Sequence, residues 1–178
     1  MKKLPKLLLK IQKRFLEFKT TYYKTPIGTA EIVGDKDGIQ SSSVIDIDLP
    51  SSHEITNNLP QCIQDCVTQL DEYFQGKRKE FNLKLNPKGT DFQKKVWNEL
   101  KTIPFGKTRT YLEQTKHIGD PKAIRAVASA NGKNPIWIVI PCHRVIGSDG
   151  SLTGYAGGIW RKKWLIDHES PVKQQSLF

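Results

Sequence analysis

The sequence predicts an α+β protein in two parts, a small N-terminal α/β domain followed by a mainly helical one. Strand-like segments and a helix precede the turn-forming run Asn86-Pro87-Lys88-Gly89, and helix-like segments with loops follow it. The charge changes at the same place: residues 25–87 carry five basic and ten acidic residues, whereas residues 88–178 carry fifteen and seven. The net charge of +8 on the second part favours a polyanionic partner, with a solvated basic surface as the alternative.

Residues 1–20 read as a basic extension. Apolar residues recur at helical spacing between Leu4 and Phe18 with lysines between them, a pattern compatible with an amphipathic helix. The apolar run near Met1 is only three residues long and no small-residue cleavage site follows, which argues against a signal peptide. With no run of eighteen apolar residues, and with three cysteines, an odd number, we expect a cytoplasmic protein with no membrane partner and no disulfide framework.

Residues 21–87 are expected to form the N-terminal domain. Its segments carry strand patterns at 22–33, 39–47 and 80–85, and a helix pattern at 60–74. A turn is predicted at Asp35-Lys36-Asp37-Gly38, and Gly76 stands where the helix should end. Cys62 and Cys66 lie four apart on that helix, but no nearby histidine or cysteine completes four ligands, so we expect no metal.

Residues 88–172 are expected to form the second domain, with 173–178 as a tail. Helices are predicted at 91–101, 111–117, 122–130 and 160–168. The apolar residues of the first helix share a core-facing side: Phe92, Val96, Trp97 and Leu100. The second and third helices are joined by Gly119-Asp120-Pro121, and two helices joined by a tight glycine-containing turn in a basic region are typical of a helix-turn-helix.

The helix over 122–130 has two different faces. At about 100° per residue, Ile124, Val127 and Ala128 fall on one side, which suits a core. The other side carries small and basic residues: Ala123, Ala126 and Ala130, with Lys122 and Ser129 nearby and Arg125 at the margin. A face of alanines lets the backbone approach another surface closely, although an alanine-rich helix can also be simply a stable helix.

One stretch of the second domain carries reactive side chains. Its apolar run, residues 136–140, lies between two prolines and predicts a short buried strand or extended segment. A thiol, an imidazole and a guanidinium follow directly, as Cys142, His143 and Arg144. Adjacent residues seldom face each other and most buried cysteines are inert, so spacing alone leaves Cys142 as either a nucleophile or a core residue.

Seven blocks of sequence occur in a defined order and spacing. They are Pro104-Phe105-Gly106, Thr110-Tyr111, Pro121 to Val127, Asn131 to Pro135, Pro141-Cys142-His143-Arg144-Val145-Ile146-Gly147, Gly154 to Gly158, and Arg161 to Glu169. In this order they resemble the O6-alkylguanine-DNA alkyltransferases (methylated-DNA–protein-cysteine methyltransferases), which repair DNA by direct reversal. The resemblance is dense over residues 90–170 and looser from Tyr22 onward. It implies a ribonuclease H-like N-terminal domain and a winged-helix second domain.

The resemblance also implies roles for individual residues. Cys142 would accept the alkyl group, with a water linking it to His143, Glu169 orienting the imidazole and Asn134 bracing the turn. Tyr111 would rotate a phosphate and help to protonate the departing guanine. These residues form the expected catalytic set.

The same resemblance implies that the third helix enters the minor groove of double-stranded DNA. Arg125 would fill the stack vacated by a flipped base. The other expected DNA-binding residues are Lys122, Ala123, Ala126, Ser129, Ala130 and Tyr111. The expected base pocket consists of Trp137, Val145, Tyr155, Ala156 and Gly157.

At three positions the chain departs from the family pattern. Trp137 stands where relatives carry a smaller residue, and we expect it to narrow the range of bulky alkyl groups accepted. Ala128 stands where glycine is usual, which a core-facing side should tolerate. Ala156 replaces the serine of some relatives, so that one hydroxyl contact to the guanine would be missing.

The expected function is stoichiometric transfer of an alkyl group from O6-alkylguanine in DNA, with O4-alkylthymine an open second substrate. An S-alkyl thioether has no electrophilic carbonyl and nothing in the sequence suggests its removal, so the protein should act once. No cofactor is expected, and the protein should be a monomer. The alternatives are a non-catalytic protein that binds alkylated DNA and a winged-helix transcription factor with an inert thiol.

Overall fold

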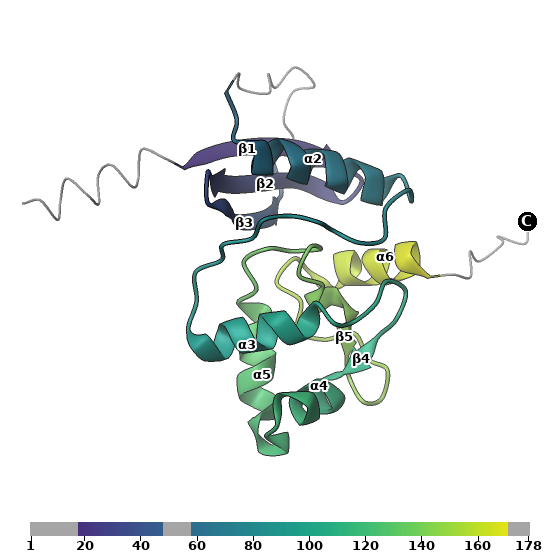
Figure 1. Ribbon diagram of the computed structural model, residues 1–178. Helices are drawn as coiled ribbons and strands as arrows, with labels where there is room; N and C mark the ends of the chain where they lie inside the picture. Colours follow the sequence, from purple (N-terminus) through teal and green to yellow (C-terminus); the bar gives the residue numbers. More distant parts are fainter. Residues whose placement is uncertain (1–17, 48–57, 171–178) are drawn as a thin grey trace, which may run out of the picture.

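The protein is described from a computed structural model that covers residues 18–47 and 58–170. Its elements are β1 (Lys19–Thr25), β2 (Gly28–Asp35), β3 (Gly38–Ile45), α2 (Gln61–Phe74), α3 (Asp91–Leu100), β4 (Arg109–Thr110), α4 (Tyr111–Ile118), the 3-10 turn η1 (Pro121–Ala123), α5 (Ile124–Gly132), the 3-10 turn η2 (Cys142–Arg144), β5 (Val145–Ile146) and α6 (Ile159–Glu169). A sheet first and helices afterwards confirm the α+β prediction (Figure 1). The pattern over residues 4–17 and the tail 173–178 lie outside the described residues.

The N-terminal sheet is an antiparallel meander in the order β1-β2-β3. The predicted strand over 22–33 is wrong in one respect, because the chain reverses within it, between Thr25 and Gly28. Pro26 cannot donate a hydrogen bond to a sheet and Gly28 has a φ of 120°, so the chain turns over residues 25–28 instead of continuing the strand. In addition, β1 begins at Lys19, inside the segment that the sequence assigned to the extension.

The predicted strand over 80–85 is absent from the structure. Only Leu85 makes an isolated bridge, to Ile39, supported by a hydrogen bond from Ile39 N to the carbonyl of Lys84 at 2.8 Å. The alternation arises because this extended linker half-buries Phe81, Leu83 and Leu85 against the core and exposes the residues between them. Burying every second side chain does not require a continuous ladder of hydrogen bonds.

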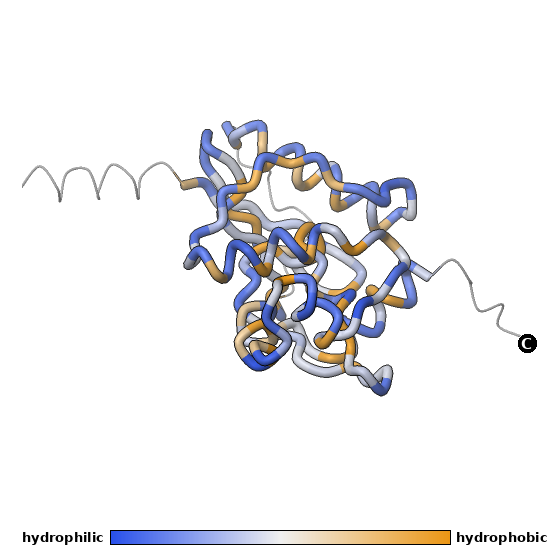
Figure 2. Tube along the Cα trace, turned by 60° about the horizontal axis from the view of Figure 1, so that its bottom comes forward, coloured by the Kyte–Doolittle hydropathy of each residue, from blue (hydrophilic) through white to orange (hydrophobic). Residues whose placement is uncertain are grey.

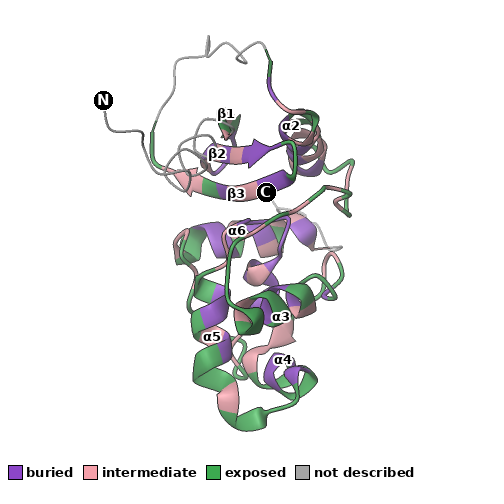
Figure 3. Ribbon diagram, turned by 60° about the vertical axis from the view of Figure 1, so that its left-hand side comes forward, coloured by how far each residue is buried: buried purple, intermediate pink, exposed green. Residues whose placement is uncertain are grey.

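Helix α2 covers the sheet with a regular apolar stripe. Its buried residues, Ile63, Cys66, Leu70 and Tyr73, recur at helical spacing, and hydrophobic and hydrophilic residues alternate along the helix accordingly (Figure 2). Figures 1 and 3 both place α6 between the sheet and the group formed by α3, α4 and α5. No helix within the described ranges is long and apolar enough to cross a membrane.

Two helices of the second domain begin with strong sequence signals. Thr90 and Gln93 form a capping box at α3, and Thr110 and Glu113 form another at α4. The predicted helix over 122–130 starts as a 3-10 turn and becomes α-helical only at Ile124. The prediction that Phe92 faces the core is wrong: it is 38% exposed, because the core lies against the side of α3 that carries Val96, Trp97 and Leu100.

The apolar run 136–140 is buried as predicted, but it is a compact turn and not a strand. Ile140 N bonds the carbonyl of Ile136 at 3.0 Å, and Ile138 has a φ of 63°. The run is joined to β3 by two hydrogen bonds, from Ser42 N to the carbonyl of Pro135 at 2.8 Å and from Trp137 N to the carbonyl of Ser42 at 3.0 Å. A short apolar run shows burial but not backbone conformation, which is why its sequence suggested a strand.

Candidate active site

Cys142 begins η2, directly after this buried turn. Asn134 holds the turn at three points: its Nδ2 donates to the carbonyl of Ile140 at 2.7 Å and to Cys142 Sγ at 3.1 Å, and its Oδ1 accepts from Ile136 N at 3.0 Å. The thiol is therefore placed by an amide that bonds both to the sulfur and to the backbone two residues before it.

His143 lies next to Cys142 in sequence but points to α6. Its Nε2 lies 2.8 Å from Oε1 of Glu169, and the two side chains are 0% and 2% exposed. Burial lowers the pKa of His143, although the negative charge of Glu169 opposes this effect. Its Nδ1 has no hydrogen-bond partner among the described residues. A neutral imidazole whose Nε2–H donates to the carboxylate therefore keeps Nδ1 as a free base.

Glu169, the last residue of α6, collects hydrogen bonds from four residues. Besides His143, Arg144 donates through Nε to Oε2 at 2.8 Å and through Nη2 to Oε1 at 3.0 Å, Tyr73 donates to Oε1 at 2.9 Å, and Gly106 N donates to Oε2 at 3.3 Å. Burial alone would raise the pKa of Glu169, but the bonds from His143 and Arg144 outweigh it and lower the pKa to about 2. The carboxylate stays ionised at neutral pH.

Three members of this network were not among the predicted site residues: Arg144, Tyr73 and Gly106, which contributes only its backbone N–H. Arg144 follows the Cys-His pair, so its position in the motif was a usable signal. Tyr73 lies 96 residues before Glu169, on the apolar stripe of α2, where a buried tyrosine looks like any other core residue.

A buried cation also lies near the thiol. Lys162 is 0% exposed, and its Nζ donates to the carbonyl of Thr153 at 2.6 Å. Burial lowers the pKa of Lys162 to about 8, which the nearby Cys142 opposes. Burial likewise raises the pKa of the Cys142 thiol, whereas the bond from Asn134 and the charge of Lys162 act in the other direction. Sequence reasoning missed Lys162, because it lies within a run of basic residues.

Cys142 opens into a small cavity of about 120 Å³. Its lining residues are Ser42, Ser43, Val44, Asn131, Gly132, Asn134, Trp137, Cys142, Gly154, Tyr155, Ala156 and Gly157. Four of the five predicted pocket residues are thus brought together around the thiol. The fifth, Val145, is fully buried and pairs with Arg109 in the β4–β5 ladder instead of lining the cavity. The residues from β3 were not anticipated.

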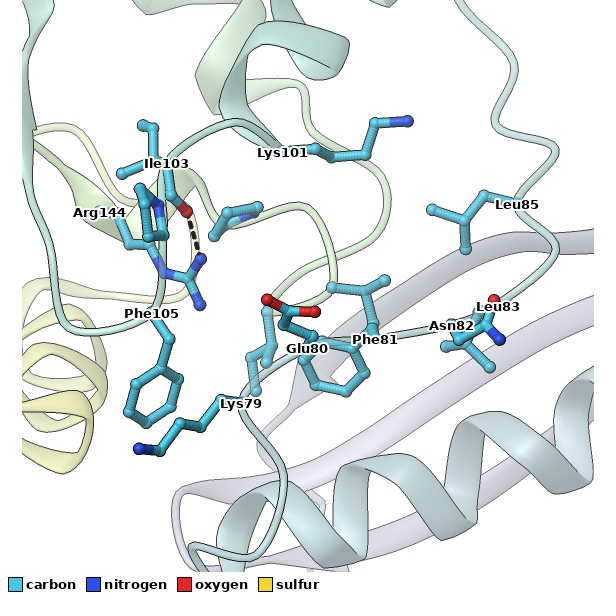
Figure 4. Close-up of a pocket in the computed structure, with 14 residues that line it drawn as sticks. Lys79, Glu80, Phe81, Asn82, Leu83, Leu85, Lys101, Ile103, Phe105 and Arg144 are labelled. Carbon is cyan, nitrogen blue, oxygen red and sulfur yellow. Dashed lines mark hydrogen bonds between the residues drawn. The ribbon is translucent and has the colours of Figure 1, made fainter.

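A larger cavity, of about 650 Å³, lies elsewhere between the linker after α2 and the second domain (Figure 4). Cys142 does not line it. Figure 4 shows Arg144 pointing to the carbonyl of Ile103, to which its Nη1 donates at 2.6 Å, and Phe105 lying beside Lys79. Neither a thiol nor an imidazole lines this space, so the chemistry belongs to the smaller cavity.

Helix α5 and the turn η1 before it present most of the predicted DNA-binding residues to solvent. Arg125, Ala126 and Ser129 of α5 are exposed. In η1, Lys122 is exposed and Ala123 is half-buried. Figure 3 shows exposed stretches along α5. Ala130 is a correction: it is only 3% exposed, because the end of α5 packs against α3.

The other face of α5 was assigned correctly for one residue and wrongly for another. Val127 is fully buried, whereas Ile124 is 37% exposed, because it stands at the free end of the helix, one residue after η1. The carbonyl of Ala130 accepts a hydrogen bond from Trp97 Nε1 at 2.9 Å, which ties the opposite end of α5 to α3.

Tyr111 begins α4 and is half-buried. Its hydroxyl donates to the carbonyl of Thr153 at 3.2 Å, the same carbonyl that Lys162 bonds. Burial, together with nearby Cys142, raises the pKa of Tyr111, so that the phenol keeps its proton at neutral pH. Tyr111 thus lies beside the Thr153 loop and shares its carbonyl acceptor with Lys162.

The cysteines of α2 make contacts typical of a core. Cys66 is buried, and Cys62 donates to the carbonyl of Asp35 at 3.1 Å. Within the described part of the chain, no three His, Cys, Asp or Glu side chains are grouped so that they could hold a metal ion.

Two family models match the chain. The model described as 6-O-methylguanine DNA methyltransferase, ribonuclease-like domain, matches residues 18–87. The model described as 6-O-methylguanine DNA methyltransferase, DNA binding domain, matches residues 91–171.

Similar proteins have related names. A methylated-DNA–protein-cysteine methyltransferase of Methanosarcina acetivorans is 46% identical over 151 residues, which cover 83% of this chain and 95% of the relative. One of Mycolicibacterium paratuberculosis is 42% identical over 162 residues, which cover 91% and 97%. The crystal structure of Mycobacterium tuberculosis O6-methylguanine methyltransferase matches with a TM-score of 0.74 and 42% identity, covering 85% of this chain and 92% of that one. A structure of the Mycobacterium tuberculosis protein OGT in complex with DNA matches with a TM-score of 0.74 and 43% identity, covering 85% and 91%.

Proposed function

The chain belongs to the 6-O-methylguanine DNA methyltransferase family, and we propose that Cys142 is the residue to which it transfers the alkyl group. It is a methylated-DNA–protein-cysteine methyltransferase that repairs O6-methylguanine in DNA. The observation that carries the assignment is the buried contact of 2.8 Å between His143 Nε2 and Glu169, which leaves the imidazole Nδ1 free beside the residue that bears the thiol.

The transfer then proceeds as a displacement at the alkyl carbon. The imidazole of His143 takes the thiol proton from Cys142, through a water, and Glu169 stabilises the imidazolium that forms. The thiolate attacks the alkyl carbon, the S–C bond forms, and the C–O6 bond breaks with its electron pair passing to the guanine. Tyr111, whose raised pKa keeps it protonated, supplies a proton to the leaving base.

Before the reaction, Cys142 is a protonated thiol and not a thiolate. Its pKa is raised by burial, so the reactive form appears only when His143 accepts the proton. This arrangement protects the thiol from indiscriminate alkylation and makes the reaction depend on a substrate held in the cavity. The product is a thioether, which the site has no means to cleave, and each molecule acts once.

The DNA contacts are proposed for the exposed side of α5. Arg125, Ala126 and Ser129 lie on it, and Lys122 lies in η1 just before it. The small residues would allow the backbone to approach the minor groove closely. Arg125 would take the place of a base flipped into the cavity of Cys142. A relative has been crystallised in complex with DNA, which supports DNA as the partner. We propose that the bound DNA is a duplex bearing O6-alkylguanine.

Further proposals concern the structural units, the oligomeric state and location of the protein, and the walls of the base pocket. We propose two structural units that divide between residues 87 and 88, the first of which begins with β1 at Lys19 and not at residue 21. We also propose a monomeric cytoplasmic protein, with Tyr155, Ala156 and Gly157 as the wall that meets the guanine. Trp137 lines the same cavity and would limit the size of the alkyl group.

The assignment of Cys142 is tested by intact-mass spectrometry after incubation with duplex DNA containing O6-methylguanine. We expect a stoichiometric gain of one methyl group, which Cys142→Ala abolishes and Cys62→Ala leaves unchanged. Transfer that persists in Cys142→Ala would show that another residue is alkylated. Lesion-dependent binding of the unaltered protein without any mass change would instead indicate a damage-binding protein.

A further inference from the structure

Oε1 of Glu169 is the meeting point of three donors. His143 Nε2 lies at 2.8 Å, Arg144 Nη2 at 3.0 Å and the hydroxyl of Tyr73 at 2.9 Å. Of the residues that bond Glu169 in the described part of the chain, only Tyr73 belongs to the region matched as the ribonuclease-like domain. The N-terminal part of the chain thus reaches the same carboxylate oxygen that orients the proposed base.

The ring of Tyr73 is fixed from several sides. It is fully buried and lies edge-on to Phe74, Phe105 and His168, with centroid separations of 5.3, 6.2 and 5.1 Å. His168 Nε2 also lies 2.8 Å from the backbone carbonyl of Tyr73. Because His168 and Glu169 are adjacent in α6, the end of α6 is attached to Tyr73 through both its backbone and its side chain.

We infer that Tyr73 is a positioning residue for alkyl transfer, which holds Glu169 and limits how strongly that carboxylate attracts the imidazole proton. The inference rests on the proposed roles of Cys142 and His143. Tyr73 suits this task because burial and the charge of Glu169 raise its pKa well above the ordinary value, so the phenol remains a neutral donor throughout the working pH range.

The effect of removing the hydroxyl follows from hydrogen bonding to a charged acceptor. With one donor fewer on Oε1, Glu169 becomes more basic and stabilises the protonated imidazole more strongly, so the pKa of His143 rises. Only neutral His143 can accept the thiol proton. In a plot of the transfer rate against pH, the acidic limb, where the rate falls as His143 becomes protonated, therefore moves to higher pH. The other titratable or charged groups around this pair, which stay in place in the variant, are Cys142, Arg144, Tyr155, Lys162 and His168.

The test compares Tyr73→Phe with Tyr23→Phe in the full chain. Tyr23 donates to Asp71 of the same helix α2 at 2.8 Å, a tyrosine–carboxylate bond with no link to Glu169. Single-turnover methyl transfer from O6-methylguanine duplex is measured as a function of pH, together with lesion-DNA affinity and urea unfolding. For Tyr73→Phe we expect the acidic limb to move up by about half a pH unit, a roughly threefold slower rate on that limb, and unchanged affinity. Tyr23→Phe should leave the profile in place.

A second replacement preserves the packing if the phenylalanine variant folds poorly. Site-specific 3-fluorotyrosine at position 73 keeps the ring shape and makes the hydroxyl a stronger donor, so the acidic limb should move to lower pH. Opposite shifts in the two proteins support the inference. A loss of unfolding stability with an unmoved pH profile would show that Tyr73 is structural only. No change in either measurement would show that its hydroxyl has no role, and would also overturn the inference. If the unaltered protein fails to transfer methyl, the proposed function fails instead.

Discussion

Replacing Glu169 by glutamine should lower the free energy of unfolding by about 3 kcal/mol at neutral pH. The magnitude follows from the fall of the Glu169 pKa from an ordinary 4.5 to about 2, because each unit corresponds to about 1.4 kcal/mol of preference for the charged form in the folded state. This figure already includes the attraction of the Arg144 guanidinium, which the replacement leaves buried without its counter-charge.

The pH dependence separates this effect from a loss of packing. A carboxyl group whose folded-state pKa is depressed contributes its full stability above the unfolded pKa of 4.5 and loses it as the pH falls through 2. The difference between the unaltered protein and Glu169→Gln should therefore shrink to less than half at about pH 3. Urea unfolding at the two pH values measures it.

Asp167→Asn is the matched control. Asp167 lies in the same helix, and its ion pair with Lys163 is exposed on both sides, so removing it should change stability far less. A Glu169→Gln deficit of equal size at neutral and acidic pH would refute the charge-based reasoning and point to packing alone.

Three further outcomes follow from the site. Trp137→Ala removes the indole from the wall of the Cys142 cavity. The rate of transfer from O6-benzylguanine should therefore increase relative to the rate from O6-methylguanine, and an unchanged ratio of the two rates would contradict this. Lys162→Met removes a buried positive charge near the thiol, so alkylation of Cys142 by iodoacetamide should need higher pH; an unmoved pH profile argues against it. Arg125→Ala should slow repair of duplex DNA roughly tenfold or more, while transfer from free O6-benzylguanine stays the same.

Local signals in the sequence predicted the helices well. The structure has capping boxes at Thr90 and Thr110 and a glycine after α4, which are short-range features whose chemistry operates within a few residues. For this reason a local pattern could locate α3 and α4 to within one residue at each end. The strands were less well predicted, because an extended linker such as residues 80–85 produces the same alternation as a strand when it lies along a core.

The site residues to which the family resemblance assigns a role were predicted, and the others were not. Cys142 and His143 are adjacent in the sequence, and the family pattern supplied Glu169, which lies 26 residues from His143. Tyr73 could not be predicted, because its contact with Glu169 depends on how α2 docks on α6. Ala130 was misplaced for a similar reason: helical periodicity orders the faces of α5, but only the packing of its last turn against α3 decides which alanine is covered.

Ile138 is a β-branched residue with a φ of 63°, a conformation that costs free energy and persists only where its surroundings leave no alternative. Hydrogen bonds from β3 and Asn134 fix the turn on both sides of it. A backbone under such constraint does not adjust to alkyl groups of different size, so the lesion must fit a rigid surface. Evolution or engineering would therefore alter the range of alkyl groups through the side chains that line the cavity, and not through the path of the chain that carries Cys142.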